Sequence, residues 1–78
     1  MERLEIFKQL TEIFEDVIDE GTIVLAESTT SGDVEGWDSL THIQLIVAIE
    51  KRFGVRFTSD ELMSWKNVGE MVDCILSK

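Results

Sequence analysis

The stretch from residue 38 to residue 54, DSLTHIQLIVAIEKRFG, decides how the rest of the chain is interpreted. It opens on Asp38, a residue type that commonly caps the first free N–H groups of a helix. No proline interrupts it, and it closes on Gly54, a residue type that commonly ends helices. The stretch therefore predicts a helix that runs from Ser39 to Phe53.

The apolar residues of this helix fall into two groups when successive residues are placed about 100° apart. One side carries Leu45, Ile46, Ile49 and Phe53, and the opposite side carries Leu40, Ile43 and Val47, together with the polar residues Gln44 and Lys51. A helix in a small bundle needs only one apolar stripe to reach the core. The second group predicts either a helix that is buried all round or an exposed apolar strip on which a partner docks.

Further helices are predicted on both sides of this one, because apolar residues recur there at spacings of three and four. The first helix is expected to end at Gly21. A short helix should follow Thr58, which has capping-box spacing with Glu61, and a last helix should begin after Asn67.

Residues 20–38 lack helical spacing, and Ser28 to Gly32 is typical of a loop. We expect Ile23 and Leu25 to attach this loop to the core. The predicted fold is therefore all-α: a small four-helix bundle, with three long helices and one short one, and a long loop between the first and second helices. It forms a single domain over residues 1–78.

The charge of the chain is strongly negative, with a formal net charge of −9 over 78 residues. The first 38 residues hold eleven acids and two bases, whereas the remaining residues are balanced. An acidic chain repels phosphate backbones, so we expect no nucleic-acid partner, and it attracts basic protein surfaces. One cysteine and one histidine provide no disulfide and no zinc site, so no metal is predicted.

The longest apolar run, residues 45–49, is far shorter than the roughly 20 residues that span a bilayer. The first residues also lack the basic and apolar regions of a secretory signal. We therefore expect no membrane span and a soluble cytoplasmic protein.

Ser39 is the candidate site residue. A serine in the first turn of a helix most often has no chemical role, but this one follows a long loop, which makes it accessible, and lies beside the second apolar group. Free N–H groups at a helix start favour a phosphate ester. A catalytic nucleophile is not predicted, because that role needs an adjacent base, and the only histidine, His42, is expected to be hydrogen-bonded on the core side.

The segment Gly36 to Leu40, GWDSL, resembles the Asp-Ser-Leu attachment motif of the acyl carrier protein family. The second helix, the segment Phe57 to Glu61 and the last helix resemble the corresponding parts of that family. The resemblance implies that a phosphopantetheinyl transferase moves 4′-phosphopantetheine from coenzyme A to Ser39, with Asp38 and Leu40 as the recognition residues beside it. The terminal thiol of the arm would then carry acyl groups as thioesters, so the protein itself is not an enzyme.

The resemblance also implies two further sets of residues. Partners with basic surfaces, such as acyl-transferring or condensing enzymes, would dock on Leu40, Ile43, Gln44, Val47, Glu50 and Lys51. An apolar slot for the acyl chain would be lined by Ile46, Ile49, Leu62 and Val72, which equally fit an ordinary core. Because partner enzymes must reach the second helix, we expect a monomer.

Gln44, Lys51 and Arg52 stand where the family commonly has acids, and Thr58 replaces a proline that is often found there. These departures favour a specialised carrier over one that serves ordinary fatty-acid synthase enzymes. The expected setting is fatty-acid, lipid or polyketide-type biosynthesis. Two alternatives remain: a peptidyl or D-alanyl carrier, and an acidic interaction module that never carries the arm.

Overall fold

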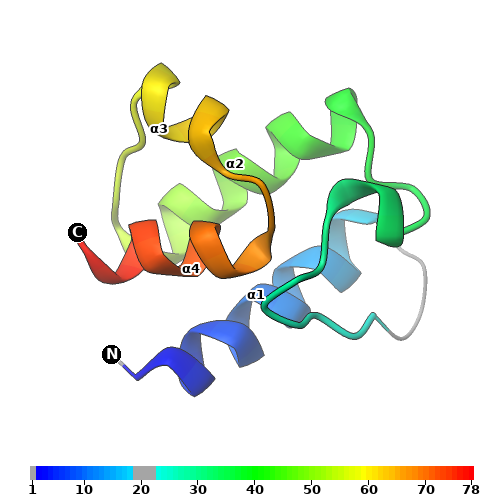
Figure 1. The fold of residues 1–78 in the computed structure, drawn as a ribbon, viewed down its shortest axis with the longest axis horizontal. Coiled ribbons are helices and arrows are strands. Elements are labelled where there is room, and N and C mark those ends of the chain that lie inside the picture. Colours follow the sequence, from blue (N-terminus) through cyan, green and yellow to red (C-terminus); the bar gives the residue numbers. More distant parts are fainter. Residues whose placement is uncertain (1, 19–22) are drawn as a thin grey trace.

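The computed structural model describes residues 2–18 and 23–78 and shows an all-helical chain (Figure 1). Its elements are α1 (Arg3–Ile18), the short 3-10 helix η1 (Ser31–Asp33), α2 (Ser39–Phe53), α3 (Ser59–Ser64) and α4 (Val68–Leu76). The predicted four-helix fold is confirmed, and η1 is an addition inside the long loop. The expected helix end at Gly21 lies outside the described residues. No helix in the described ranges is long and apolar enough to cross a bilayer.

Both ends of α2 are fixed by the residues that the sequence marks. Asp38 Oδ1 accepts hydrogen bonds from the backbone N–H groups of Leu40 (3.0 Å) and Thr41 (2.9 Å). At the other end Gly54 has φ 66°, a left-handed conformation that a side chain disfavours. Its N–H donates to the carbonyl of Glu50, so the last turn of the helix is closed.

The starts of α3 and α4 use different caps. Thr58 and Glu61 exchange two hydrogen bonds, of 3.1 Å and 2.8 Å, and form the predicted capping box. Asn67 Oδ1 accepts from the N–H of Glu70 at 2.9 Å. The Glu70 carboxylate, however, accepts from the N–H of Lys66, one residue earlier than the box requires. The predicted start of α4 is therefore correct, and its cap consists of the Asn67 side chain without the reciprocal bond seen at α3.

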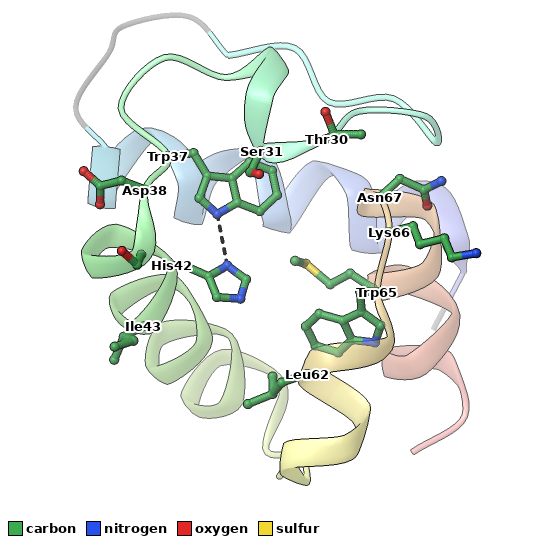
Figure 2. A pocket seen from close by; sticks show the side chains of 12 residues that line it. Thr30, Ser31, Trp37, Asp38, His42, Ile43, Leu62, Trp65, Lys66 and Asn67 are labelled. Atoms are coloured by element: carbon green, nitrogen blue, oxygen red, sulfur yellow. Dashed lines mark hydrogen bonds between the residues drawn. The ribbon is translucent and has the colours of Figure 1, made fainter.

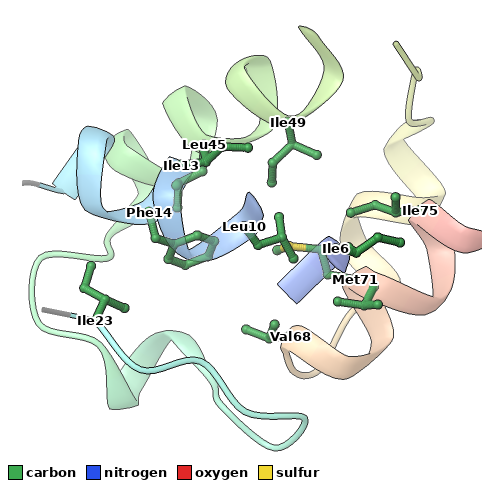
Figure 3. Close-up of a cluster of buried hydrophobic side chains, with 11 residues drawn as sticks. Ile6, Leu10, Ile13, Phe14, Ile23, Leu45, Ile49, Val68, Met71 and Ile75 are labelled. Carbon is green, nitrogen blue, oxygen red and sulfur yellow. The ribbon is translucent and has the colours of Figure 1, made fainter. Parts of the chain in front are cut away.

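The core lies where α1, α2 and α4 meet (Figure 3). Its buried members are Ile6, Leu10, Ile13, Phe14, Ile23, Leu45, Ile49, Val68, Met71, Val72 and Ile75. Every long helix supplies part of it through one apolar stripe. Ile23 is buried in this core and Leu25 packs partly against it, as predicted for the long loop.

The long loop is also held against the start of α4. The N–H of Gly69 donates to the carbonyl of Glu27 at 2.9 Å, and a Cβ placed on Gly69 would lie 2.8 Å from that oxygen. The approach therefore requires glycine. Arg3 binds the Glu27 carboxylate at 2.5 Å and the Asp73 carboxylate at 2.6 Å, and these bonds raise the pKa of its guanidinium. These bonds hold the start of α1, the loop and α4 together.

Cys74, the single cysteine, lies on α4 and is half-buried rather than fully buried. Burial raises the pKa of its thiol, and the nearby carboxylate of Glu61 raises it further. Glu61 is itself paired with Lys78 at 2.8 Å, which lowers the pKa of the Glu61 carboxyl.

Candidate functional site

Ser39 is the first residue of α2 and is exposed to solvent. Its hydroxyl makes no hydrogen bond to any of the residues that the structure describes. The free N–H groups predicted beside it are mostly absent: Leu40 and Thr41 donate to the side chain of Asp38, and His42 donates to its carbonyl at 2.8 Å. Because the Asp38 cap already uses these donors, the helix start can favour a phosphate mainly through its dipole.

The turn before Ser39 is fixed by hydrogen bonds through Thr41. The Thr41 hydroxyl donates to the carbonyl of Gly36 at 2.8 Å and accepts from the N–H of Asp38 at 2.8 Å. Gly36 has φ 88°, which favours glycine at this point. The N–H of Thr41 lowers the pKa of the Asp38 carboxyl, so this cap is ionised at neutral pH. The backbone therefore presents Ser39 from a fixed position.

Trp37 and His42, which lie on either side of Ser39 in the sequence, form a hydrogen-bonded pair. The indole Nε1–H of Trp37 donates to His42 Nδ1 at 3.0 Å (Figure 2). The indole also packs edge-on against the ring of Phe14, with the centroids 4.9 Å apart. Through this contact, Trp37 anchors the loop to the core. His42 is half-buried on the inner side, as predicted, and burial lowers the pKa of its imidazole.

A cavity of about 500 Å³ opens beside Ser39 (Figure 2). It is lined by Thr30, Ser31, Trp37, Asp38, Ser39, His42, Ile43, Leu62, Trp65, Lys66, Asn67 and Met71. These residues come from the loop, the start of α2, and α3 with the beginning of α4. The volume lies within the range of small-molecule sites, about 300–1,000 Å³. The cavity therefore has both apolar and polar walls next to the exposed side chain of Ser39.

The lining differs from the predicted acyl slot, because only Leu62 of the four predicted residues belongs to it. Ile49 and Val72 are fully buried, and Ile46 is 8% exposed. Ile49 and Val72 belong to the buried core, whereas the cavity lies nearer Ser39, around His42.

Several of the lining residues were not predicted as site residues. Trp65 borders the cavity and packs edge-on against Phe57 with centroids 5.0 Å apart. The signal available in the sequence was aromatic: Trp37 and His42 flank Ser39, and Trp65 follows the short helix. Thr30, Ser31 and Met71 carry no such signal, since only the folded structure brings the loop and α4 to this place.

The second apolar group of α2 is exposed. Leu40, Ile43 and Val47 have exposed fractions of 67%, 63% and 47%. The helix is therefore not buried all round, and these three residues form an outer strip on α2. Gln44 and Lys51 are exposed as well. Met63 on α3 is a further exposed apolar side chain, outside the group predicted on α2.

Glu50 differs from the other residues predicted to meet partners. It is half-buried, and its carboxylate accepts a hydrogen bond of 2.9 Å from the N–H of Phe57. This contact ties the end of α2 to the segment that leads into α3. Glu50 therefore has a structural partner of its own within the chain.

Comparison with known proteins identifies the family to which this site belongs. The sequence model described as "Phosphopantetheine attachment site" matches residues 8–75. The acyl carrier protein of Acidothermus cellulolyticus is 37% identical over 71 residues, covering 91% of this chain and 84% of the relative. The chain belongs to the acyl carrier protein family. The acyl carrier protein of Coprothermobacter proteolyticus is 35% identical over 80 residues, covering 99% of this chain and 94% of the relative.

A solved structure agrees with this assignment to the acyl carrier proteins. The solution structure of a holo acyl carrier protein from Geobacter metallireducens superimposes with a TM-score of 0.85 at 40% identity, covering 92% of this chain and 83% of the other. The protein is thus a carrier and not an enzyme, and its prosthetic group is phosphopantetheine. The site fits that group, because an exposed hydroxyl lies at the edge of a cavity that has both apolar and polar walls.

Proposed function

We propose that Ser39 carries the 4′-phosphopantetheine arm and that the protein presents acyl thioesters on this arm to partner enzymes. The observation that carries the proposal is the exposed Ser39 hydroxyl, which lies inside the family-matched segment at the start of α2 and at the edge of the cavity. Asp38 and Leu40 flank it and are the residues that a phosphopantetheinyl transferase would recognise first.

The attachment step uses a base that the transferase supplies. The Ser39 oxygen attacks the pyrophosphate of coenzyme A, a new P–O bond forms, and the bond to the adenosine bisphosphate leaving group breaks. The hydroxyl proton passes to the transferase. His42 is unsuited to take it, because its Nδ1 accepts from Trp37 and burial disfavours its protonated form.

The outer strip on α2 is the surface that we assign to partner enzymes. An exposed apolar strip beside the attachment site suits a shallow hydrophobic docking face, and the net charge of −9 attracts enzymes with basic surfaces. Gln44 and Lys51 border the strip, and Glu50 contributes negative charge near its end. Acyl-transferring and condensing enzymes of fatty-acid, lipid or polyketide biosynthesis are the proposed partners.

Other features follow from the same proposal. The names of the relatives favour an acyl cargo over a peptidyl or D-alanyl cargo, and the family match disfavours a module without an arm. A monomer leaves α2 free for successive enzymes. A cytoplasmic location gives access to coenzyme A, the donor of the arm.

The proposal is tested by intact mass after incubation with coenzyme A and a promiscuous phosphopantetheinyl transferase. We expect a gain of one phosphopantetheine, and no gain in Ser39→Ala. Ser31→Ala is the matched control, because Ser31 is also an exposed serine on the wall of the same cavity, and it should be loaded normally. Loading of folded Ser39→Ala, or no loading of the unmodified chain beside a working control carrier, would contradict the proposal.

A further inference from the structure

The Trp37–His42 pair fixes where the imidazole keeps its proton. The indole Nε1 of tryptophan is only a donor, so the nitrogen that faces it must be an acceptor. His42 Nδ1 is that nitrogen, 3.0 Å from Trp37 Nε1. In a neutral imidazole the proton then lies on the other nitrogen, Nε2. His42 is therefore held as a neutral ring whose Nε2–H is a donor.

This donor faces the cavity beside Ser39. His42 lines the cavity, and Figure 2 shows its ring between Trp37 and Leu62, with the second nitrogen directed away from the indole. Nε2 has no hydrogen-bond partner among residues 2–18 and 23–78. No buried side-chain nitrogen or oxygen within those ranges lacks a partner, so Nε2 must have open surface. A donor is thus available at the cavity wall.

The surroundings keep this donor in place. Trp37 is wedged against Phe14, and its ring lies nearly parallel to that of His42 at a centroid distance of 6.0 Å. The imidazole is half-buried, which disfavours the charged form that would place protons on both nitrogens. A preorganised donor loses little freedom when an acceptor arrives.

The distance along α2 indicates which acceptor can reach it. Ser39 and His42 are three residues apart on one helix, so their Cβ atoms lie about 5–6 Å apart. An arm on Ser39 places its pantoyl part next to the phosphate, and that part carries a hydroxyl, an amide carbonyl and two methyl groups. The oxygens suit the Nε2–H donor, and the methyl groups suit apolar neighbours on the wall such as Leu62 and Ile43.

We propose that the cavity receives the pantoyl part of the arm and that His42 Nε2–H donates a hydrogen bond to one of its oxygens. Trp37 acts as the positioning residue that holds the imidazole in the required form. This inference rests on the proposed attachment at Ser39. It assigns to the two residues a role in recognising the prosthetic group, which the predicted aliphatic slot did not contain.

The test is nuclear magnetic resonance of the imidazole in apo and unacylated holo protein, with loading verified by mass. His42 is the only histidine, so its ring signals are unambiguous. We expect the Nε2–H signal to shift in the holo form and its exchange with water to slow by about fivefold, as one net hydrogen bond allows. With a labelled arm, contacts between the pantoyl methyl groups and Leu62 should also appear.

Two variants separate the donor from simple packing. His42→Gln keeps both an acceptor for Trp37 and a donor for the arm, so it should retain the arm contacts, whereas His42→Phe should lose them. Trp37→Phe should release the tautomer, seen as mixed imidazole nitrogen signals. The measurement on the unmodified chain keeps the test decisive even where a variant fails to fold.

The outcomes are distinguishable. Verified loading without any change at Nε2–H would overturn this inference and leave attachment at Ser39 intact. A change that appears only after a hydroxyacyl or ketoacyl cargo is added would assign the donor to the cargo and overturn its assignment to the arm. Failure to load at all would overturn the proposed function and this inference with it.

Discussion

The inner side of α2 carries Leu45 and Ile49, which are fully buried, whereas the outer side carries Ile43 and Val47, which are 63% and 47% exposed. The side chains are of the same aliphatic kind, and the helix is the same. The inner residues belong to one buried cluster with residues of α1 and α4 and contribute to folding through buried area. The outer residues gain little from folding, so their apolar character calls for another explanation, for which we propose docking. On this helix, the position of a residue around the axis, and not its type, decides whether it stabilises the fold or is available for docking.

The largest difference between the two sides of α2 is expected in the free energy of unfolding. Leu45→Ala should lower the free energy of unfolding by about 2–5 kcal/mol, because it removes buried methyl groups and leaves a cavity. Ile43→Ala should change it by less than about 0.5 kcal/mol. Urea unfolding followed by circular dichroism measures both. If Leu45→Ala does not fold, Ile49→Val, at about 0.5–1.5 kcal/mol, keeps the inner side measurable. Equal losses on the two sides would refute the distinction.

An intermediate effect is expected on docking. Ile43→Asp places a charge in the middle of the outer strip, and loss of a well-placed apolar contact costs an interface more than about 1 kcal/mol. We expect the kcat/KM for arm attachment by the transferase to fall about tenfold, with unfolding unchanged. Val24→Asp is the matched control, because Val24 is 81% exposed but lies in the long loop. A similar fall in both variants would show that the strip has no special part.

The smallest effect concerns charge at the end of the strip. Lys51 forms no ion pair within the described residues, whereas Arg52 contacts Glu12 of α1 at 3.3 Å. Lys51→Glu should raise the affinity for a basic synthase a few-fold at low salt, without loss of stability. Arg52→Glu should raise it too, but at a cost in unfolding free energy below about 1 kcal/mol, since it turns an exposed pair into a repulsive one. Titration at two salt concentrations measures the affinities, and unchanged binding in both variants would contradict the proposed role of charge.

The sequence predicted features that depend on neighbours along the chain. The helix from Ser39 to Phe53, its cap at Asp38 and its end at Gly54 were all correct, because capping needs only residues two to four positions apart. The two apolar sides of α2 were visible for the same reason. Local spacing is also why the helix start at Asn67 was found.

The cavity was not predictable in the same way, because it depends on how distant segments meet. Thr30 and Ser31 reach it only because the loop is held against α4, and Met71 comes from another helix. Of the residues predicted for the acyl slot, only Leu62 lines this cavity, whereas Ile49 and Val72 belong to the buried core. The expectation of free N–H groups beside Ser39 was wrong, since the side chain of Asp38 accepts hydrogen bonds from those of Leu40 and Thr41.

The half-buried thiol of Cys74 bears on how well a carrier of this kind keeps its cargo. A thioester is lost when a neighbouring thiolate attacks it, and the attacking species is the thiolate and not the thiol. Burial and the carboxylate of Glu61 both raise the pKa of the Cys74 thiol, so at neutral pH it stays protonated. The thiol of Cys74 should therefore react only slowly with the acyl thioester on the arm. The acyl group should then stay on the arm until a partner enzyme binds.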